Sequence, residues 1–151
     1  MKALTIWQPW ASLIACGAKR IETRHWPAPP AVVGQRIAIH AARTRAHLDI
    51  ALDPRYAAAL RRGTDAGIHE HDALPFGAIV ATAILASCDE LTYDDVTRLQ
   101  AEDPDEHAFG WYLPHRFAWR LEHVRPVLPP IPTIGRQGLY DVDDPEADHR
   151  G

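Results

Sequence analysis

The sequence predicts a single α+β domain, a small and mostly antiparallel barrel or curved sheet with short helices inserted between the strands. Two observations support this fold class. Short runs of alternating apolar and polar residues are typical of half-buried strands, and segments with helix-capping signals separate them. The 151 residues, 46% of them hydrophobic, can bury one core without disulfides. Because no repeat or linker is visible, we expect one domain over residues 1–142 and an acidic tail over 143–151 that frays.

The first elements are a strand, a helix and a second strand. Alternation over Ala3–Trp7 predicts the first strand. Pro9 suits the first position of a helix of about two turns, which Gly17 can end in a left-handed conformation. Alternation resumes over Lys19–Arg24, which we interpret as the second strand.

The rest of the chain continues this pattern of strands and short helices. The expected elements are, in order, a strand over 36–41, helices over 44–52 and 54–60, a polar loop over 64–75, a strand over 77–88, a helix opening with the capping-box pattern Thr92-Tyr93-Asp94-Asp95, a strand over 117–122, an extended connection through the prolines at 126, 129, 130 and 132, and a strand over 138–142. The strand over 77–88 is the most apolar, so we expect it to cross the middle of the sheet.

Charge is strongly segregated along the chain, although the formal net charge is only −4. Lys19–Arg62 carries nine basic and three acidic residues, 9 − 3 = +6, whereas Asp65–Glu106 carries one basic and eleven acidic residues, 1 − 11 = −10. The first segment can therefore present a positive surface to phosphate. The alternative is that both segments are ordinary solvated surface. The pattern favours an anionic partner without identifying it.

The cysteines and the longest apolar run of the sequence bear on the cellular compartment of the protein. Cys16 and Cys88 lie in apolar surroundings without CxxC spacing, and no secretory leader precedes them, so we expect reduced, packed thiols. The apolar run Ala78–Ala86 is far short of the roughly 18–20 residues that a membrane-spanning helix needs. We therefore expect a cytoplasmic protein with no membrane partner.

The most informative feature of the sequence is a series of short blocks spread along the chain. The blocks are Trp7-Gln8-Pro9-Trp10-Ala11, Gly17-Ala18-Lys19-Arg20-Ile21-Glu22-Thr23-Arg24, Ile39-His40-Ala41-Ala42, Gly77-Ala78-Ile79-Val80-Ala81, Phe117-Ala118-Trp119 and Gln137-Gly138-Leu139. Together they resemble the ASCH domain family (activating-signal-cointegrator homology) over roughly residues 1–142. The resemblance implies a PUA-like β-barrel, related to RNA-binding domains, with a cleft lined by the GxKxxExR segment.

Lys19, Glu22 and Arg24 carry the GxKxxExR pattern and form the centre of the candidate site. A guanidinium offers a planar fork of donors to phosphate or a base edge, an ammonium adds a mobile charge, and a carboxylate can accept from a base amino group. The alternative is a surface ion pair that contributes about 0–1 kcal/mol to stability.

Aromatic and further basic residues extend this candidate site. Indole rings can stack on bases, and Trp7 and Trp26 flank the charged segment, whereas Trp10 and Trp119 lie on apolar stripes that we expect in the core. The complete predicted nucleic-acid-binding set is Trp7, Lys19, Glu22, Arg24, Trp26, His40, Arg43 and Arg45.

Two histidine-containing segments have competing interpretations. His40 can serve a phosphate or act as an acid or base, or it can be a structural hydrogen-bonding residue within its strand. The run His69-Glu70-His71-Asp72 has HxH spacing, but the sequence offers no convincing third or fourth ligand. We therefore predict neither a metal nor a cofactor.

These observations favour a nucleic-acid-binding module, for RNA or another single strand, whose cleft accepts an unstacked base. A hydrolase of a modified nucleoside is an alternative, because some ASCH relatives remove the acyl group from N4-acetylcytidine with a lysine, a threonine and a glutamate. Lys19 matches that lysine, but Glu22 stands where the threonine is, so Lys19 and Glu22 would be the catalytic residues. A metal-independent ribonuclease using His25, His40, Lys19 and Arg24 is a third interpretation. The oligomeric state is left open.

Overall fold

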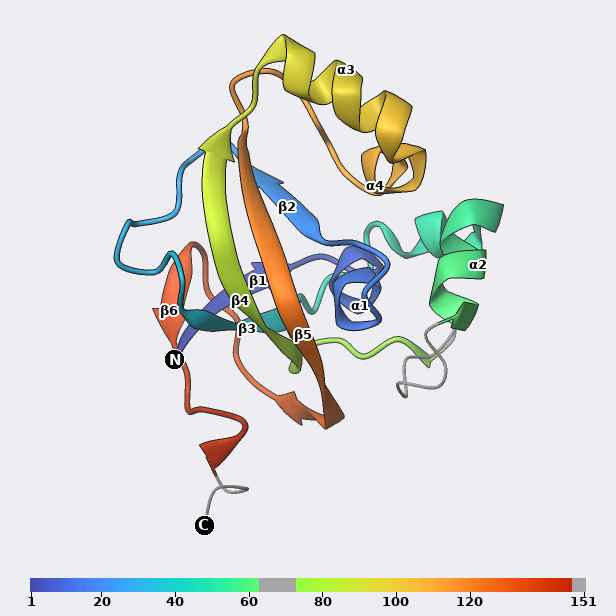
Figure 1. The fold of residues 1–151 in the computed structure, drawn as a ribbon. Helices are drawn as coiled ribbons and strands as arrows, with labels where there is room; N and C mark the ends of the chain where they lie inside the picture. The colour runs from blue at the N-terminus through green and yellow to red at the C-terminus, as the bar shows by residue number, and fades with distance from the viewer. Residues whose placement is uncertain (63–72, 148–151) are drawn as a thin grey trace.

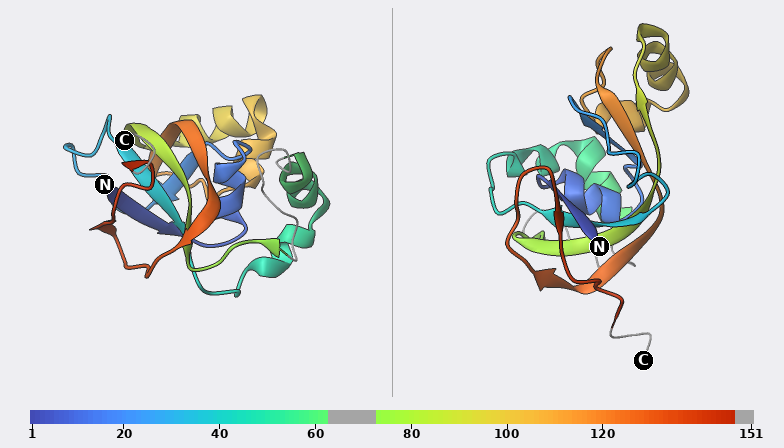
Figure 2. Two further views of the ribbon diagram at one scale, coloured as in Figure 1. Left: turned by 90° about the horizontal axis from the view of Figure 1, so that it is seen from below. Right: turned by 90° about the vertical axis from the view of Figure 1, so that its left-hand side faces the viewer.

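The computed structural model describes residues 1–62 and 73–147, and these residues form an α+β fold built on one mixed sheet (Figure 1). Within them the strand order is β2-β5-β4-β3-β1-β6. The strands are β1 (Lys2–Ile6), β2 (Ile21–Arg24), β3 (Arg36–Ala41), β4 (Ala78–Glu90), β5 (Phe117–Pro132) and β6 (Leu139–Asp141). β1 and β3 pair in parallel, and the other neighbouring strands pair antiparallel. The long, bent β4 and β5 curve the sheet into a half-barrel (Figure 2).

Helix α1 (Trp10–Ala15) fills the concave side of this half-barrel and packs against β3, β4 and β5. Its Leu13 and Ile14 are fully buried, so the predicted apolar stripe does form the core. Pro9 lies one residue before the helix rather than at its first position. The side chain of Gln8 supports the helix start, since its Oε1 accepts a hydrogen bond from the Ser12 amide at 3.0 Å.

The segment between β3 and β4 is less helical than the sequence predicts. The helix expected over 44–52 is a 3₁₀ turn, η1 (Leu48–Leu52), whereas α2 (Pro54–Arg62) forms where a helix was expected. In η1 no side chain caps the first turn, and the single buried residue is Ala51, so little packing favours a longer helix there. Most of the loop predicted over 64–75 lies outside the described residues.

β5 continues through the prolines that were expected to form an extended connection. Pro132 pairs with Ala78 and Pro126 with Ala81, so this segment completes the long ladder with β4. The register between the two strands shifts at several points, which accommodates residues that lack an amide donor. The predicted extended conformation is therefore correct, but the segment is part of strand β5 rather than a connection.

Helices α3 (Tyr93–Glu102) and α4 (Pro104–Ala108) lie together beyond one end of β4 and β5 (Figure 1). The predicted capping box of α3 is present: the Thr92 hydroxyl accepts from the Asp95 amide at 3.1 Å, and the Asp95 carboxylate accepts from the Thr92 amide at 2.9 Å. The sequence analysis missed α4, although Asp103-Pro104 is a typical helix start with proline at the first position.

The remaining expectations concern the thiols, the tail and the membrane. Cys16 and Cys88 are both free. Part of the acidic tail lies against the sheet, where Glu146 accepts from the Thr82 hydroxyl at 3.1 Å and forms an ion pair with Arg125 at 2.9 Å. Every helix in the described ranges is too short or too polar to cross a bilayer.

Candidate functional site

A pocket of about 830 Å³ brings together residues that are far apart in the sequence. Its lining combines charged residues, Lys19, Glu22, Arg24, His25, Arg116 and Arg136, with the aromatic residues Trp7, Trp10, Trp26, Tyr56, Phe109 and Trp111. With histidine neutral, four basic groups face one acidic group, 4 − 1 = +3. The pocket therefore offers flat apolar surfaces and a positive field in the same place.

The turn after α1 positions Lys19 at this pocket. Gly17 adopts the left-handed conformation expected of it, with φ of 82°, and its amide donates to the Ile14 carbonyl at 3.0 Å. The Lys19 amide then donates to the Leu13 carbonyl at 3.0 Å. These bonds reverse the chain at the end of α1 and bring the lysine next to the start of β2.

The Lys19 ammonium is buried without a hydrogen-bond acceptor. The residue is only 1% exposed, and its Nζ is one of the buried polar atoms that find no partner in the described residues. Nζ lies 5.5 Å from the centroid of the Tyr112 ring. Burial lowers the pKa of Lys19, while the carboxylates of Glu22 and Glu106 oppose that shift in part. An unpartnered buried donor of this kind costs stability, so the fold maintains it against a penalty.

Gly110 packs closely against this ammonium and the Tyr112 ring. Gly110 also lines the pocket, and a Cβ placed on it would lie 3.0 Å from Lys19 Nζ and would collide with the ring of Tyr112. A side chain at this position would therefore displace the ring or crowd the lysine. The absence of a side chain at Gly110 therefore lets Tyr112 and Lys19 pack directly against the backbone beside the pocket.

Glu22 and Arg24 project from β2 as the alternation predicted. Ile21 and Thr23 are buried, whereas Glu22 and Arg24 are half-buried and line the pocket. Arg24 donates through Nη2 to the Thr5 carbonyl at 2.7 Å, and its buried Nε has no partner within residues 1–62 and 73–147. Among the ion pairs of the described residues, none joins Glu22 to a cation, so the alternative of a surface ion pair does not hold.

Glu106 of α4 is a buried carboxylate that the sequence analysis missed. Its Oε1 accepts from the amides of Arg20 and Ile21, at 2.9 and 2.6 Å, and from the Tyr112 hydroxyl at 3.2 Å, while Oε2 has no partner. Burial, reinforced by Glu106, raises the pKa of Tyr112. Glu106 thus fixes the backbone that carries Lys19 and places a second negative charge near the ammonium. The Asp103-Pro104 helix start was the signal that could have drawn attention to it.

Two tryptophans are exposed at the mouth of the pocket. Trp7 is 52% exposed, and one face of its indole stacks on His47 with ring centroids 4.4 Å apart. Trp111 is 66% exposed, and the Arg116 guanidinium carbon lies 4.9 Å from the centroid of its ring. The sequence analysis had not included either Trp111 or Arg116 in the site, because both lie far along the chain from β2.

The other tryptophans divide between the core and the pocket wall. Trp119 is fully buried, as expected. Trp26 is half-buried and packs edge-on against Trp119, and it also lines the pocket. Trp10 packs against the core but contributes to the pocket lining, where its Nε1 donates to the Tyr56 hydroxyl at 3.3 Å. The pocket wall is therefore an extension of the hydrophobic core.

Three predicted site residues lie outside the pocket lining. His40 is 1% exposed, with Nδ1 3.2 Å from the Thr5 hydroxyl and Nε2 2.7 Å from the Thr133 carbonyl. Burial lowers the pKa of His40, and the hydrogen bond to Thr133 opposes the shift. Arg43 and Arg45 are exposed, and Arg45 covers the Phe76 ring. The HxH run over 69–72 lies outside the described residues.

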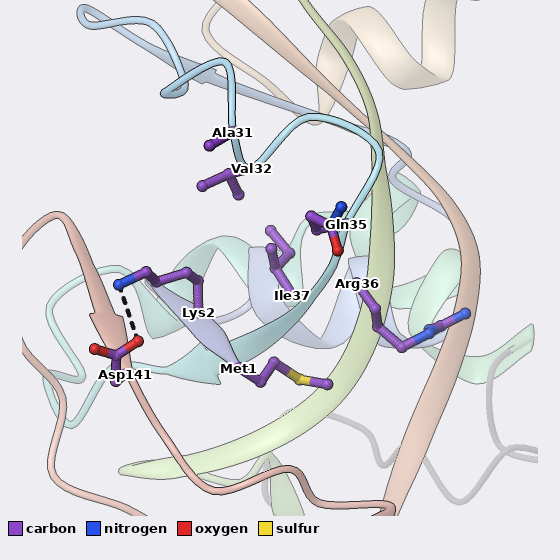
Figure 3. A pocket seen from close by; sticks show the side chains of 8 residues that line it. All are labelled: Met1, Lys2, Ala31, Val32, Gln35, Arg36, Ile37 and Asp141. Atoms are coloured by element: carbon purple, nitrogen blue, oxygen red, sulfur yellow. Dashed lines mark ion pairs between the residues drawn. The ribbon is translucent and has the colours of Figure 1, made fainter.

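A second, smaller pocket of about 330 Å³ lies beside the N-terminus (Figure 3). Its lining contains Lys2, Arg36 and Asp141 together with small aliphatic residues, and no aromatic ring. Lys2 pairs with Asp141 at 2.9 Å. Because its charges are exposed or paired, this pocket is a weaker candidate for a ligand site.

Comparisons with known proteins identify the family. The family model of the ASCH domain matches residues 4–131, and no curated protein matches the chain. Among solved structures, an ASCH protein of Zymomonas mobilis is similar at 17% identity with a TM-score of 0.56, covering 97% of this chain and 90% of that one. A serine-to-alanine mutant of the same protein gives 16% identity and a TM-score of 0.56, with coverage of 99% and 92%. At these identities the structures share a fold, and because the family model spans most of the sequence, the chain belongs to the ASCH domain family.

Proposed function

We propose that this ASCH protein is a nucleic-acid-binding module whose large pocket accepts an unstacked base of single-stranded RNA. The observation that carries the proposal is the buried Lys19 ammonium, which has no acceptor among the described residues and lines an aromatic pocket. A base carbonyl or ring nitrogen would supply the missing acceptor and remove the penalty of the unpaired donor. The family's PUA-like fold, with its RNA-binding relatives, supports the same class of ligand.

The pocket's other groups suit the remaining parts of a nucleotide. About 830 Å³ falls within the range of about 300–1,000 Å³ that is typical of ligand sites. Glu22 can accept from an exocyclic amino group, and the buried Arg24 Nε is a second unused donor. Arg116 and Arg136 add positive charge for a phosphate.

A fluorescence anisotropy titration of labelled single-stranded RNA tests the proposal. We expect binding that weakens between about 50 and 200 mM salt, and at least about a hundredfold loss in Lys19→Met, because that variant removes the donor and leaves the aromatic walls intact. Lys2→Met is the matched control, since Lys2 is exposed and paired with Asp141. Absence of binding, affinity indifferent to salt, or equal behaviour of the two lysine variants would refute the proposal.

A second candidate function is hydrolysis of N4-acetylcytidine, which the lowered pKa of Lys19 favours. Because burial disfavours the charged ammonium, more of the neutral amine is available as a nucleophile or base. Glu22 would take a proton from the water that attacks the acetyl carbonyl, and that proton would pass to N4 as the bond from the acetyl carbon to N4 breaks, giving acetate and cytidine. Incubation of the protein with N4-acetylcytidine, followed by chromatography for cytidine, tests this activity. Product formation no greater than in Lys19→Ala would exclude it.

The ribonuclease alternative requires His40 next to the same phosphate as Lys19. His40 is buried and bonded through both ring nitrogens, and it does not line the pocket. This arrangement gives the ribonuclease alternative no support, although His25, Lys19 and Arg24 share the pocket lining.

A further inference from the structure

Trp111 and Arg116 form a preformed unit at the mouth of the large pocket. The Thr23 hydroxyl donates to the Trp111 carbonyl at 2.8 Å. Arg116 donates to the Thr23 carbonyl through Nη2 at 2.9 Å and to the Thr23 hydroxyl through Nε at 3.3 Å. Thr23 follows Glu22 in β2, so these bonds tie the backbone of Trp111 and the Arg116 guanidinium to the strand that carries the candidate site. The fixed guanidinium in turn contacts the indole of Trp111, although 66% of that residue is exposed.

An exposed indole in contact with a fixed guanidinium differs from an ordinary surface aromatic. One face of the Trp111 ring is covered by the Arg116 guanidinium, and the high exposure of the residue leaves ring surface open to solvent. Tyr93 provides a contrast, because it is 74% exposed but lines neither pocket. A flat aromatic surface backed by a cation is the arrangement on which nucleic acid bases stack.

The charges around Trp111 indicate which class of molecule the open surface fits. Arg116 and Arg136 line the same pocket as Trp111, and neither forms an ion pair with a carboxylate among the described residues. Cations beside a stacking surface complement a base and its phosphate, whereas an apolar protein segment would leave them unpaired.

Resting on the proposed function, we propose that Trp111 stacks the nucleotide adjacent to the one in the pocket and that Arg116 neutralises the phosphate between the two. The ligand is then a single-stranded oligonucleotide rather than a free nucleoside. The pocket holds one base next to Lys19, and the platform holds its neighbour outside. This second subsite would account for an exposed tryptophan that contributes little to the core.

Comparing short oligonucleotides with mononucleotides tests the platform. The probes are fluorescein-labelled homopolymers about five nucleotides long, prepared as RNA and as DNA, and the corresponding 5′-monophosphates measured by calorimetry. In the wild-type protein we expect the better-binding homopolymer to bind more tightly than its monophosphate. Trp111→Ala should weaken the homopolymer about tenfold to a hundredfold and change the monophosphate less than about twofold. The tighter of the RNA and DNA probes identifies the type of strand.

Matched variants separate this proposal from the proposed function. Trp111→Phe should retain most of the affinity, and Tyr93→Ala should behave as wild type, because Tyr93 is an exposed aromatic away from the pocket. Lys19→Met should weaken both classes of probe. If the monophosphate binds in a Lys19-dependent way while the homopolymer binds no tighter, or if Trp111→Ala weakens both probes equally, the platform is refuted and the base pocket stands. If no probe binds, both proposals fail together.

Discussion

The two pockets each contain a lysine, and the two lysines are in opposite situations. At the small pocket the Lys2 side chain is 45% exposed and pairs with Asp141 at 2.9 Å. At the large pocket Lys19 is 1% exposed, and its ammonium has no hydrogen-bond partner among the described residues. The charges of a surface ion pair stay hydrated, so the pair contributes little to stability, whereas a buried ammonium without a hydrogen-bond partner is destabilising. Under the proposed function, the fold keeps Lys19 at this cost in stability because the ammonium binds the ligand.

Replacing the acidic neighbour of each lysine should give the largest difference in protein stability between the two pockets. Glu106 accepts from two backbone amides and from the Tyr112 hydroxyl, and it is buried. Glu106→Ala would leave these donors unpaired, so we expect a loss of about 3–5 kcal/mol in the free energy of unfolding. Asp141→Ala should change it hardly at all, because the partners at the small pocket are exposed. Urea denaturation measures both. Similar losses in the two variants would contradict the contrast.

Replacing Lys19 with methionine should stabilise the protein, whereas most substitutions of buried residues destabilise it. At pH 7 we expect Lys19→Met to raise the free energy of unfolding by about 1–3 kcal/mol, because the cost of burying the ammonium exceeds its attraction to Glu22 and Glu106. Lys2→Met should leave it nearly unchanged. Chemical denaturation at neutral pH checks both. Destabilisation by Lys19→Met would show that the lysine contributes to the fold instead.

The same pair of variants has a distinct pH dependence. The folded pKa of Lys19 is lowered by burial, below the unfolded value of about 10.4. Unfolding therefore takes up a proton between the two pKa values, and the wild-type free energy of unfolding rises with pH in that interval. The advantage of Lys19→Met should shrink as the pH approaches 10. A constant advantage across this range would mean that Lys19 is not a titrating buried group.

His40 tests whether burial alone marks a ligand site. Like Lys19 it is buried and titratable, but both of its ring nitrogens have partners. We expect His40→Ala to cost about 1–3 kcal/mol of stability and to leave RNA affinity unchanged. Denaturation and anisotropy titration measure the two quantities. A large loss of affinity in a folded His40→Ala protein would reopen a direct role for this residue.

The stability contributed by neutral His40 should also depend on pH. Burial holds the folded pKa below the unfolded value of about 6.5. The contribution is therefore complete above that value and is lost as the pH falls through the folded pKa. Between pH 7 and 5 the wild-type protein should lose more stability than His40→Ala, and parallel loss in the two proteins would contradict this.

Replacing one arginine at each pocket should give the smallest difference, which we expect in RNA affinity. Arg116→Gln should weaken RNA binding about threefold to tenfold and make the slope of log affinity against log salt shallower by about 1, because one phosphate contact is lost. Arg36→Gln at the small pocket should alter neither quantity, since Arg36 donates to the Thr82 hydroxyl instead. Titrations at several salt concentrations check this. An equal effect of the two variants would remove the distinction between the pockets.

The sequence predicted that Lys19, Glu22 and Arg24 share one cleft, and they do line one pocket, because the features that place them there are local. The left-handed Gly17 and the period of two in β2 together direct Lys19, Glu22 and Arg24 to one pocket. The prediction failed where it assumed that residues close in sequence share a surface. β3 lies between β4 and β1 and is buried on both faces, so His40 was enclosed rather than presented to solvent.

The residues that complete the site could not be predicted from sequence, because tertiary packing brings them there. Glu106 reaches the amide of Ile21 across 85 positions of the chain, and Arg116 reaches Thr23 across 93. No local pattern encodes such distances. The Asp103-Pro104 signal locates α4, but only the packing of α4 against β2 makes Glu106 part of the site.

The basic and acidic segments of the chain partly pair with one another in the folded protein, which their segregation along the sequence did not suggest. Two arginines of the basic segment are neutralised within the molecule, since Arg20 pairs with Asp103 and Arg55 pairs with Asp105 on either side of Pro104. These pairs join α4 to the residue before β2 and to α2, and they are separate from the cations that line the large pocket, which are Lys19, Arg24, Arg116 and Arg136. A nucleic acid strand bound at this pocket would be contacted at one site rather than along its whole length. Under the proposed function, that site would hold one base in the pocket and its stacked neighbour on Trp111.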